Sequence, residues 1–588
     1  MSTWDLSVFY KSLEAWTKDL ETLEPLIETL ASYQGKLHDF DAFLSFYQHE
    51  QKTTHVLYRL YAFIHLNSDL NLKDQEKSAK NQQMQLLLAK LSQKTSFVSP
   101  ELILIGKEKI MSFCDKNDFL NTYRFQFEKL FHQQKHVLDG DQEKILANFQ
   151  PTRSIPTSLY QAIAIVDAVD EEVTLSDGKK QTVTLSNFRS LLPKLALPED
   201  RQLVFEAAFK RFKDHKTAFA SIYNLVLQQQ KANAQSRNYP STLDAALFRN
   251  NIPTTVYHNL VDVAYENTEP IKRYIALRKK HLKLERYHTY DRFLKLAEDD
   301  TNYSYAEAKK LFIESLAHFD QEFIDHQVDA IKDGFVDAYP QDGKRTGAYS
   351  SGFYGFHPYI LLNHDDTLDS VFTLAHEAGH SAHTIFSSES QPMATSDYTI
   401  FVAEIASTFN EHNLLDYLLQ KAKTKDQKIV LLESAIDGIM STFYRQTLFA
   451  TYELKANTLV EKGVPVTDQA LSQIMIDLYK HYYDIDIETE NGKAYVWAYI
   501  PHLFHTPFYV YQYATSYSAS LKIYDNVKTK KTNAMENYKN LLKSGGSKYP
   551  VEQAALAGAD LTNKETFMAV IKRFNELIDQ LEKVLEES

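Results

Sequence analysis

Apolar and polar residues alternate with helical spacing along most of the chain. Stretches such as LETLEPLIETLASY and HVLYRLYAFIHLNSDL place apolar residues three and four positions apart, which is the repeat of an amphipathic helix. This pattern predicts antiparallel helices over residues 1–110, and it returns from 197 onward. Glycine and proline are scarce, with 16 of each among 588 residues, which also favours helices. We therefore expect a mainly α protein.

Two short segments have the pattern of β-strands instead. EEVTLSDGKKQTVTL places two β-rich runs around Asp177 and Gly178, a dipeptide typical of a hairpin with a primed turn. Residues 345–364, RTGAYSSGFYGFHPYILLNH, combine glycines, aromatic residues and an apolar run. They predict one or two strands immediately before the next helix.

The order of these elements suggests three regions. We expect an N-terminal helical region over 1–110, a lid-like helical segment with the hairpin over 111–196, and a catalytic region over 197–588. The SGGSKYP segment at 544–550 lacks the Gly-Lys-Ser/Thr ending of a phosphate-binding loop. We interpret it as a flexible turn.

Composition limits the range of partners and compartments. The formal net charge of −13 argues against binding to nucleic acid or to an anionic membrane. The single cysteine, Cys114, fits a reducing compartment. The N-terminus has no signal-peptide pattern, and no apolar run approaches the ~20 residues of a membrane helix. We expect a cytoplasmic protein, whose oligomeric state the sequence leaves open.

The segment VFTLAHEAGHSAH, residues 371–383, has the spacing of a metal site. On a helix, His376 and His380 lie about 40° and ~6 Å apart, so both imidazoles can reach one ion. Glu377 points about 100° away from His376, where it can reach a water on the open position of the ion rather than the ion itself. The apolar neighbours argue against a solvated surface helix, because buried unpaired charges are costly.

The third ligand must come from elsewhere. His383 lies ~10 Å along the axis from His376, too far to share the ion. It is interpreted as a substrate-side or supporting residue, or as a plain surface histidine. Glu404 is a lone carboxylate among apolar residues of a second helix, which indicates a cationic partner. Glu411, seven residues on, either supports a ligand imidazole or forms a structural salt bridge.

The helix ends follow from capping residues. Asp366 or Thr367 is expected to cap the helix of the histidines, and Ser396 or Asp397 the helix of Glu404. Gly379 costs about 1 kcal/mol of helix propensity, so we expect it to permit a close approach of substrate or of a neighbouring helix.

An aromatic stretch at 498–520 supplies candidate hydrogen-bond donors for an oxyanion. A tyrosine at every second position does not fit one face of a helix, so some of these residues belong to the core or the rim. The crowded residues are His502, His505, Tyr509, Tyr511, Tyr513 and Tyr517. We also expect the strand segment before the HEAGH helix to present an edge with which an extended peptide could pair.

These motifs together resemble the oligoendopeptidase F family, within the wider group of thimet-oligopeptidase-like zinc peptidases. The resemblance runs along most of the chain. It is carried by TWDLS, GAYSSGFYGFHPYILLN, HEAGHSAH, FVAEIASTFNE, IPHLFHTPFYVYQYATS and SGGSKYPVEQAALAGADL.

The resemblance implies a two-lobed helical clam with a deep internal channel and a small β-sheet beside the HEAGH helix. It implies an endopeptidase that cleaves short peptides, because such a channel excludes folded chains. Carried over by position, one Zn²⁺ would be bound by His376, His380 and Glu404, and Glu377 would be the general base.

The resemblance also implies residues that contact the substrate. His502 and Tyr511 match the histidine and tyrosine that hydrogen-bond the scissile carbonyl, with Tyr509 as a further candidate. His357, in the strand segment, is a candidate substrate contact. This chain has Phe504 where members often have tyrosine, so that hydroxyl's role is absent or passes to His505 or a neighbouring tyrosine.

The sequence therefore predicts a zinc metalloendopeptidase acting on short peptides. Two histidines and a carboxylate favour zinc over manganese or cobalt. Two alternatives remain open: a module that binds peptides without cutting them, and a carboxypeptidase-type zinc hydrolase.

Overall fold

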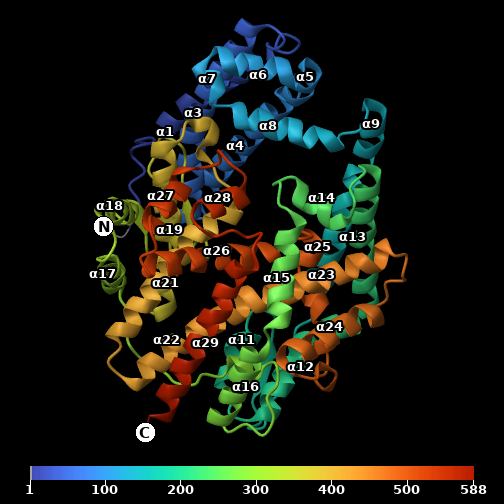
Figure 1. Ribbon diagram of the computed structural model, residues 1–588, viewed down its shortest axis with the longest axis vertical. Helices are drawn as coiled ribbons and strands as arrows, with labels where there is room; N and C mark the ends of the chain where they lie inside the picture. Colours follow the sequence, from blue (N-terminus) through green and yellow to red (C-terminus); the bar gives the residue numbers. More distant parts are fainter. Residues whose placement is uncertain (1–2, 588) are drawn as a thin grey trace. The chain divides into compact units, whose positions relative to one another are not determined.

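The computed structural model describes residues 3–587, and helices form most of them (Figure 1). This confirms the mainly α prediction. The chain divides into two compact units. The first comprises residues 3–135, 301–417 and 523–559, and the second comprises 136–300, 418–522 and 560–587. The predicted division into three regions is a different one and stays a prediction, as does the channel.

The first unit holds a set of helices and a small sheet. Its helices are α1 (Leu13–Leu20), α2 (Leu23–Ala31), α3 (Phe40–Leu70), α4 (Gln75–Lys94), α5 (Val98–Ile105), α6 (Lys107–Lys116), α7 (Asp118–Asn121), α8 (Arg124–Gln133), α17 (Tyr305–Ser315), α18 (Gln321–Ala330), α19 (Leu368–Ser390), α20 (Met393–Ser396), most of α21 (Ile400–Lys421), α27 (Ala534–Lys543) and α28 (Pro550–Leu556).

The second unit contains the hairpin and the remaining helices. They are α9 (Gly140–Asn148), α10 (Ile155–Gln161), α11 (Phe188–Leu191), α12 (Pro198–Asp214), α13 (Lys216–Ser236), α14 (Thr242–Phe248), α15 (Thr254–Glu266), α16 (Glu269–His281), α22 (Lys425–Ile439), α23 (Arg445–Glu461), α24 (Asp468–Tyr483), α25 (His502–His505), most of α26 (Tyr511–Lys528) and α29 (Lys564–Glu586).

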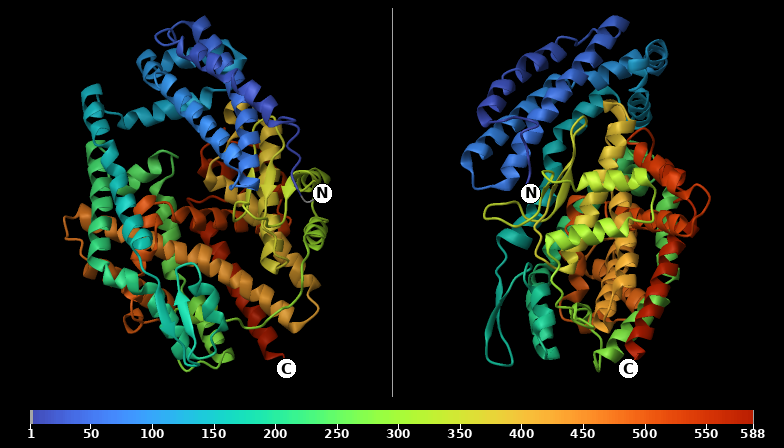
Figure 2. Two further views of the ribbon diagram at one scale, coloured as in Figure 1. Left: turned by 180° about the vertical axis from the view of Figure 1, so that it is seen from behind. Right: turned by 90° about the vertical axis from the view of Figure 1, so that its left-hand side faces the viewer.

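The predicted hairpin is present, but its turn is of another type (Figure 2, teal). Strands β1 (Glu171–Thr174) and β2 (Lys180–Val183) pair antiparallel. A primed turn needs positive φ at its central residues, whereas only Gly178 has positive φ here, at 82°. Its N–H donates to the carbonyl of Leu175 at 2.8 Å. Gly178 is therefore the last residue of the turn, where glycine is favoured.

The small sheet lies beside α19, as expected. Its order is β3-β5-β4, from β3 (Val336–Asp337), β4 (Tyr349–Ser351) and β5 (Tyr359–Leu361). The fully buried β5 pairs parallel with β3 and antiparallel with β4. Ser350 of β4 shares a 2.8 Å hydrogen bond between hydroxyls with Ser381 of α19. The sheet thus contacts the helix of the HEAGH motif directly.

The TWDLS motif attaches the N-terminal segment to this sheet. The indole of Trp4 donates to the carbonyl of Ile360 at 2.8 Å, and Thr3 donates to the carboxylate of Asp337 at 2.8 Å. The N–H of Asp5 donates to the carbonyl of Gly334 at 2.7 Å. The motif therefore has a structural explanation within the first unit.

Helix α19 begins as predicted, and α21 does not. The hydroxyl of Thr367 caps α19 by accepting from the N–H of Ser370. The predicted caps of α21, Ser396 and Asp397, instead end the separate short helix α20. Helix α21 begins at Ile400, and its first N–H groups donate to the carbonyl of Thr399. It therefore starts two residues later than a cap at Asp397 would place it, and three later than a cap at Ser396.

The SGGSKYP segment is a turn packed tightly against the end of α20 and the residue that follows it. The N–H of Gly546 donates to the carbonyl of Thr395 at 2.7 Å. A Cβ atom built on Gly545 would lie 2.3 Å from the carbonyl oxygen of Thr395, and one on Gly546 would lie 2.0 Å from that of Asp397. Both glycines are thus required by the approach of two backbones, and the segment is a packing turn rather than a flexible one.

Candidate metal centre

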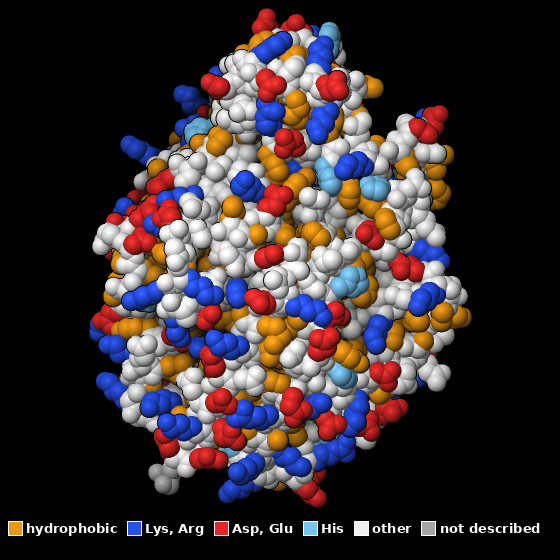
Figure 3. Space-filling model, in the orientation of Figure 1, with side chains coloured by type: hydrophobic (Ala, Val, Ile, Leu, Met, Phe, Trp, Pro, Cys, Tyr) orange, Lys and Arg blue, Asp and Glu red, His pale blue; other side chains and the backbone are white. Residues whose placement is uncertain are grey.

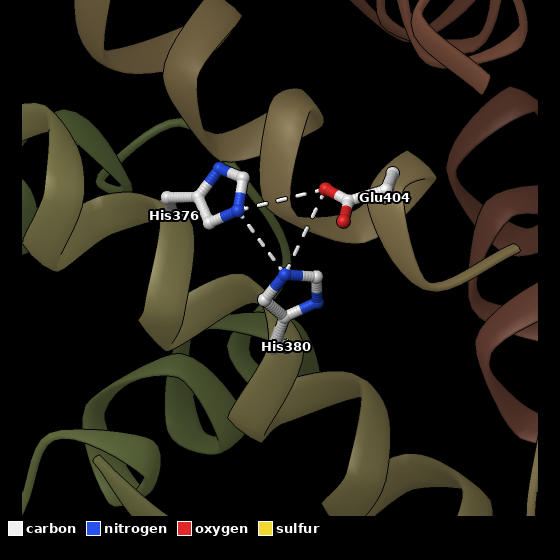
Figure 4. Close-up of side chains that lie close together, drawn as sticks. All are labelled: His376, His380 and Glu404. Carbon is white, nitrogen blue, oxygen red and sulfur yellow. Dashed lines mark hydrogen bonds and ion pairs between the residues drawn. The ribbon is translucent and has the colours of Figure 1, made fainter. Parts of the chain in front are cut away.

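His376 and His380 of α19 face Glu404 of α21 (Figure 4). The Nε2 atoms of the two imidazoles are 3.1 Å apart. The Oε2 atom of Glu404 lies 3.5 Å from Nε2 of His376 and 3.8 Å from Nε2 of His380. A point about 2.0 Å from all three atoms lies near their plane, and zinc binds nitrogen and carboxylate oxygen at about that distance. The donor set therefore fits a divalent ion.

Side chains around the three ligands orient them. The Nδ1 atom of His376 donates to the carboxylate of Glu411 at 2.5 Å, so in the neutral imidazole the lone pair is on Nε2, which faces the other ligands. The hydroxyl of Ser407 donates to Glu404 Oε2 at 3.1 Å. A hydrogen bond with the backbone of Ala403 orients His380.

The electrostatics of the cluster favour a cation. Burial opposes charge on His376, yet Glu411 first of all, with Glu377 and Glu404, raises the pKa of its imidazole to about 9. Burial, followed by the neighbouring His376, lowers the pKa of His380 well below its usual range. Carboxylates thus outnumber the charges that the histidines can carry, and a bound metal ion would restore the balance.

Asn410 connects α21 to two other helices. Its buried side-chain amide donates to the carbonyl of Ala375 on α19 at 3.0 Å and to Gln327 of α18 at 2.8 Å. Loss of a hydrogen bond made by a buried amide group leaves a polar group unpaired, which is costly. These bonds fix α21 lengthwise against the helix of the histidines.

Glu377 lies next to the ligands without belonging to their cluster. Its side chain is 6% exposed, and burial raises its pKa to about 7. The backbone N–H of Ser350 on β4 donates to this carboxylate. Its Oε2 atom has no hydrogen-bond partner among the described residues. A buried carboxylate with an unused oxygen is suited to accept a proton from a water molecule or a substrate.

Neither His383 nor His357 has a ring nitrogen free for a substrate. Both nitrogens of His383 are buried, and both nitrogens of His357 are hydrogen-bonded to the protein. His383 is fully buried, stacks on Tyr398 at 3.6 Å, and has a pKa lowered to about 3 by burial. This excludes the surface alternative and argues against the predicted substrate contact. His357 bonds through its two nitrogens to the carbonyls of Pro358 and Asp329, which likewise leaves none for a substrate.

The predicted substrate-contact residues of the aromatic stretch belong to the second unit. The half-buried rings of His502 and Tyr509 stack at 5.9 Å, and Tyr513 meets both edge-on. Tyr511, the first residue of α26, is buried and packs on Tyr257. These residues stand outside the three-ligand cluster of the first unit.

Phe504 is a core residue. Its ring packs between Tyr160, at 4.4 Å, and Tyr223, at 5.3 Å, and is 3% exposed. The neighbouring His505 meets Tyr160 edge-on, and its Nε2 atom is buried without a hydrogen-bond partner among the described residues. Phe504 therefore has no hydroxyl to offer, and the Nε2 atom of His505 is not accessible as a replacement.

Comparisons with known proteins identify the family. Residues 192–573 match the model of peptidase family M3, and residues 101–168 match that of oligopeptidase F. The chain is similar to oligopeptidase PepF of Bacillus subtilis, with 32% identity over 99% of this chain and 87% of that one. The chain belongs to peptidase family M3, a family of metallopeptidases, and the resemblance to oligoendopeptidase F is confirmed.

Solved structures agree with this assignment. A putative peptidase from Chlamydophila abortus superposes with a TM-score of 0.91 at 32% identity, covering 99% of this chain and 98% of that one. Oligoendopeptidase F from Enterococcus faecium superposes with a TM-score of 0.74 at 27% identity, covering 97% and 99%. Among the described residues, no helix is long and apolar enough to span a bilayer.

Proposed function

We propose that this protein is a zinc metalloendopeptidase that hydrolyses internal bonds of short peptides. The observation that carries the proposal is the triangle of His376, His380 and Glu404, with Glu377 beside it. Three protein ligands and an open fourth position are typical of catalytic zinc, whereas structural zinc takes four protein ligands. Membership of a metallopeptidase family supports the same conclusion.

Glu377 and Glu411 of the first unit have separate parts in this mechanism. Bound zinc would lower the pKa of a coordinated water and polarise the peptide carbonyl. Glu377 accepts the proton of the attacking water through its unpaired carboxylate oxygen and then donates it to the leaving amine. Glu411 keeps the proton of His376 on Nδ1, so that Nε2 stays a ligand.

The edge of the small sheet supports binding of an extended peptide. Strand β4 is the outer strand in the order β3-β5-β4, so one of its sides has no strand partner in this sheet. Its Ser350 bonds both Glu377 and Ser381. A peptide that pairs with this edge would run beside the general base, with main-chain bonds providing affinity.

Donors to the oxyanion are proposed from the family resemblance. His502 and Tyr511 are the first candidates, and the half-buried Tyr509 is the next. The net charge of −13 supports peptides rather than nucleic acid as partners, and the single cysteine supports a cytoplasmic location. On the face shown in Figure 3, acidic and basic side chains are interspersed.

The test is mass spectrometry of a peptide panel incubated with purified protein, with and without a chelator. Internal cuts that disappear with chelator and return with added zinc would establish the endopeptidase. Removal of single C-terminal residues would indicate the carboxypeptidase-type alternative. Intact peptides from a zinc-loaded protein would indicate the binding module.

A further inference from the structure

The turn between α25 and α26 contains a strained residue. Phe508 has a backbone φ of 54°, in the left-handed region that residues other than glycine or asparagine rarely adopt. Pro507 precedes it, and the buried Phe508 ring packs on Tyr257 at 5.9 Å. Strain of this kind persists only where surrounding contacts impose it, and such residues concentrate at functional sites.

Glu453 of α23 makes a hydrogen bond that holds the backbone of Phe508 in this conformation. Its Oε1 atom accepts a 2.6 Å hydrogen bond from the backbone N–H of Phe508. The Glu453 side chain is 1% exposed, and no cation lies within 4.0 Å of it among residues 3–587. Burial raises its pKa to about 8, so near neutral pH the carboxyl group retains its proton.

Helix α23 contacts this turn a second time through Tyr257. The Tyr257 hydroxyl donates to the carbonyl of Ala450, one turn before Glu453, at 2.7 Å. Its ring then contacts both Phe508 and Tyr511, the latter at 5.1 Å. The position of the Tyr511 ring thus depends on the turn that Glu453 fixes.

We propose that Glu453 is a positioning residue, which places Tyr511 for catalysis by holding the N–H of Phe508. The inference rests on the proposed function, because it assumes that the Tyr511 hydroxyl serves the reaction. A purely structural position would favour an apolar residue, since a buried carboxyl group without a cation is costly. A glycine at 508 would likewise remove the strain. Both costs are explained if the turn needs one fixed conformation.

Amide hydrogen exchange on the zinc-loaded protein tests the contact without relying on activity. Glu453→Met should speed exchange in the peptide covering 506–511 at least tenfold, whereas Glu453→Gln, which keeps the acceptor, should change it less than threefold. The matched control is Thr447→Val, a buried residue of α23 whose hydroxyl bonds the carbonyl of Phe443. Exchange at the wild-type rate in Glu453→Met would overturn the proposal, whether or not the protein is a peptidase.

Kinetics test whether the contact acts through Tyr511. Glu453→Met should lower kcat at least tenfold with KM and zinc content nearly unchanged, and Glu453→Gln should restore most of kcat. In a Tyr511→Phe background, Glu453→Met should cost less than a further threefold. A full tenfold cost in that background, or a wild-type rate for Tyr511→Phe itself, would overturn the positioning role. If Glu453→Met does not fold, Glu453→Asp, which is too short for the bond, replaces it in both tests.

Discussion

Gly379 of α19 lies directly against the backbone of Ser407 in α21. A Cβ atom built on Gly379 would be 2.7 Å from the Cα atom of Ser407 and 2.6 Å from the carbonyl oxygen of Ala406. Only a residue without a side chain allows these backbones to meet. Gly379 immediately precedes His380 on α19, and Ser407 follows Glu404 by three residues on α21. The contact between them therefore sets the distance between the ligands that the two helices carry.

Gly379→Ala should force the two helices apart. The overlap is with backbone atoms, which no rotamer change relieves, so we expect a loss of about 1–3 kcal/mol in the free energy of unfolding. Zinc affinity should fall at least about tenfold as Glu404 moves away from the histidines. Urea unfolding and competition with a zinc chelator measure the two effects.

The control is Gly438→Ala in α22, where a Cβ atom would meet nothing within 4 Å. This substitution should stabilise the helix by up to about 1 kcal/mol and leave zinc affinity unchanged. Wild-type stability and affinity in Gly379→Ala would show that the helices can adjust at no cost.

Glu411→Ala should weaken zinc binding without removing a ligand. His376 would lose the acceptor that fixes its tautomer, and losses of such partners cost about 10–100-fold in metal affinity. Glu389→Ala is the matched control, because Glu389 bonds the Nε2 atom of His326 at 2.9 Å in the same unit. Equal affinities of the two variants would assign the Glu411 contact no role in metal binding.

Glu377→Gln should remove turnover while zinc stays bound. A general base contributes about 10²–10⁴-fold in rate, and Glu377 is not one of the three clustered ligands. Single-turnover rates and metal analysis of the same sample measure both properties. Full activity would exclude Glu377 as the base, and loss of zinc would make it part of the metal site.

Glu453 should give the protein a recognisable pH dependence of stability. Burial raises the pKa of its carboxyl group to about 8 in the folded state, against 4.5 for an ordinary glutamate such as that of the unfolded chain. Between these values the unfolded chain releases a proton that the folded chain retains, so this residue's contribution to the free energy of unfolding falls as pH rises. The facing Tyr223 and Tyr257 have pKa values raised well above 10 by burial and stay neutral throughout.

Glu453→Gln does not titrate, so its stability should rise relative to the wild type from pH 4.5 to pH 8, by up to about 5 kcal/mol. Urea unfolding of both proteins at several pH values gives this difference. A difference that stays constant with pH would mean that Glu453 ionises normally in the folded state.

The ligand cluster was predictable because helical spacing is local. The angle between His376 and His380 follows from four residues of helix, and Glu404 was found as a lone carboxylate in an apolar helix. The same signal marks Glu453 in FATYELKAN, and the sequence analysis missed it. Its partner is a backbone N–H of a strained turn, which leaves no pattern in the sequence.

Other features depend on contacts between distant segments. Helix α21 begins at Ile400 rather than directly after Ser396 or Asp397, because these two residues end α20. His383 is charged or polar by type, and only tertiary packing on Tyr398 decides that it is buried. Spacing along a helix cannot report either outcome.

The turn at Gly545 and Gly546 bears on the stability of the metal-free protein. It contacts the backbone just before α21, so the conformational entropy of the helix that carries Glu404 is lost during folding rather than on metal binding. Small zinc domains unfold when a chelator removes their ion, because metal binding supplies most of their folding free energy. We therefore expect this fold to form without the ion, so a chelated sample should recover full zinc binding when zinc is added back, with no refolding step.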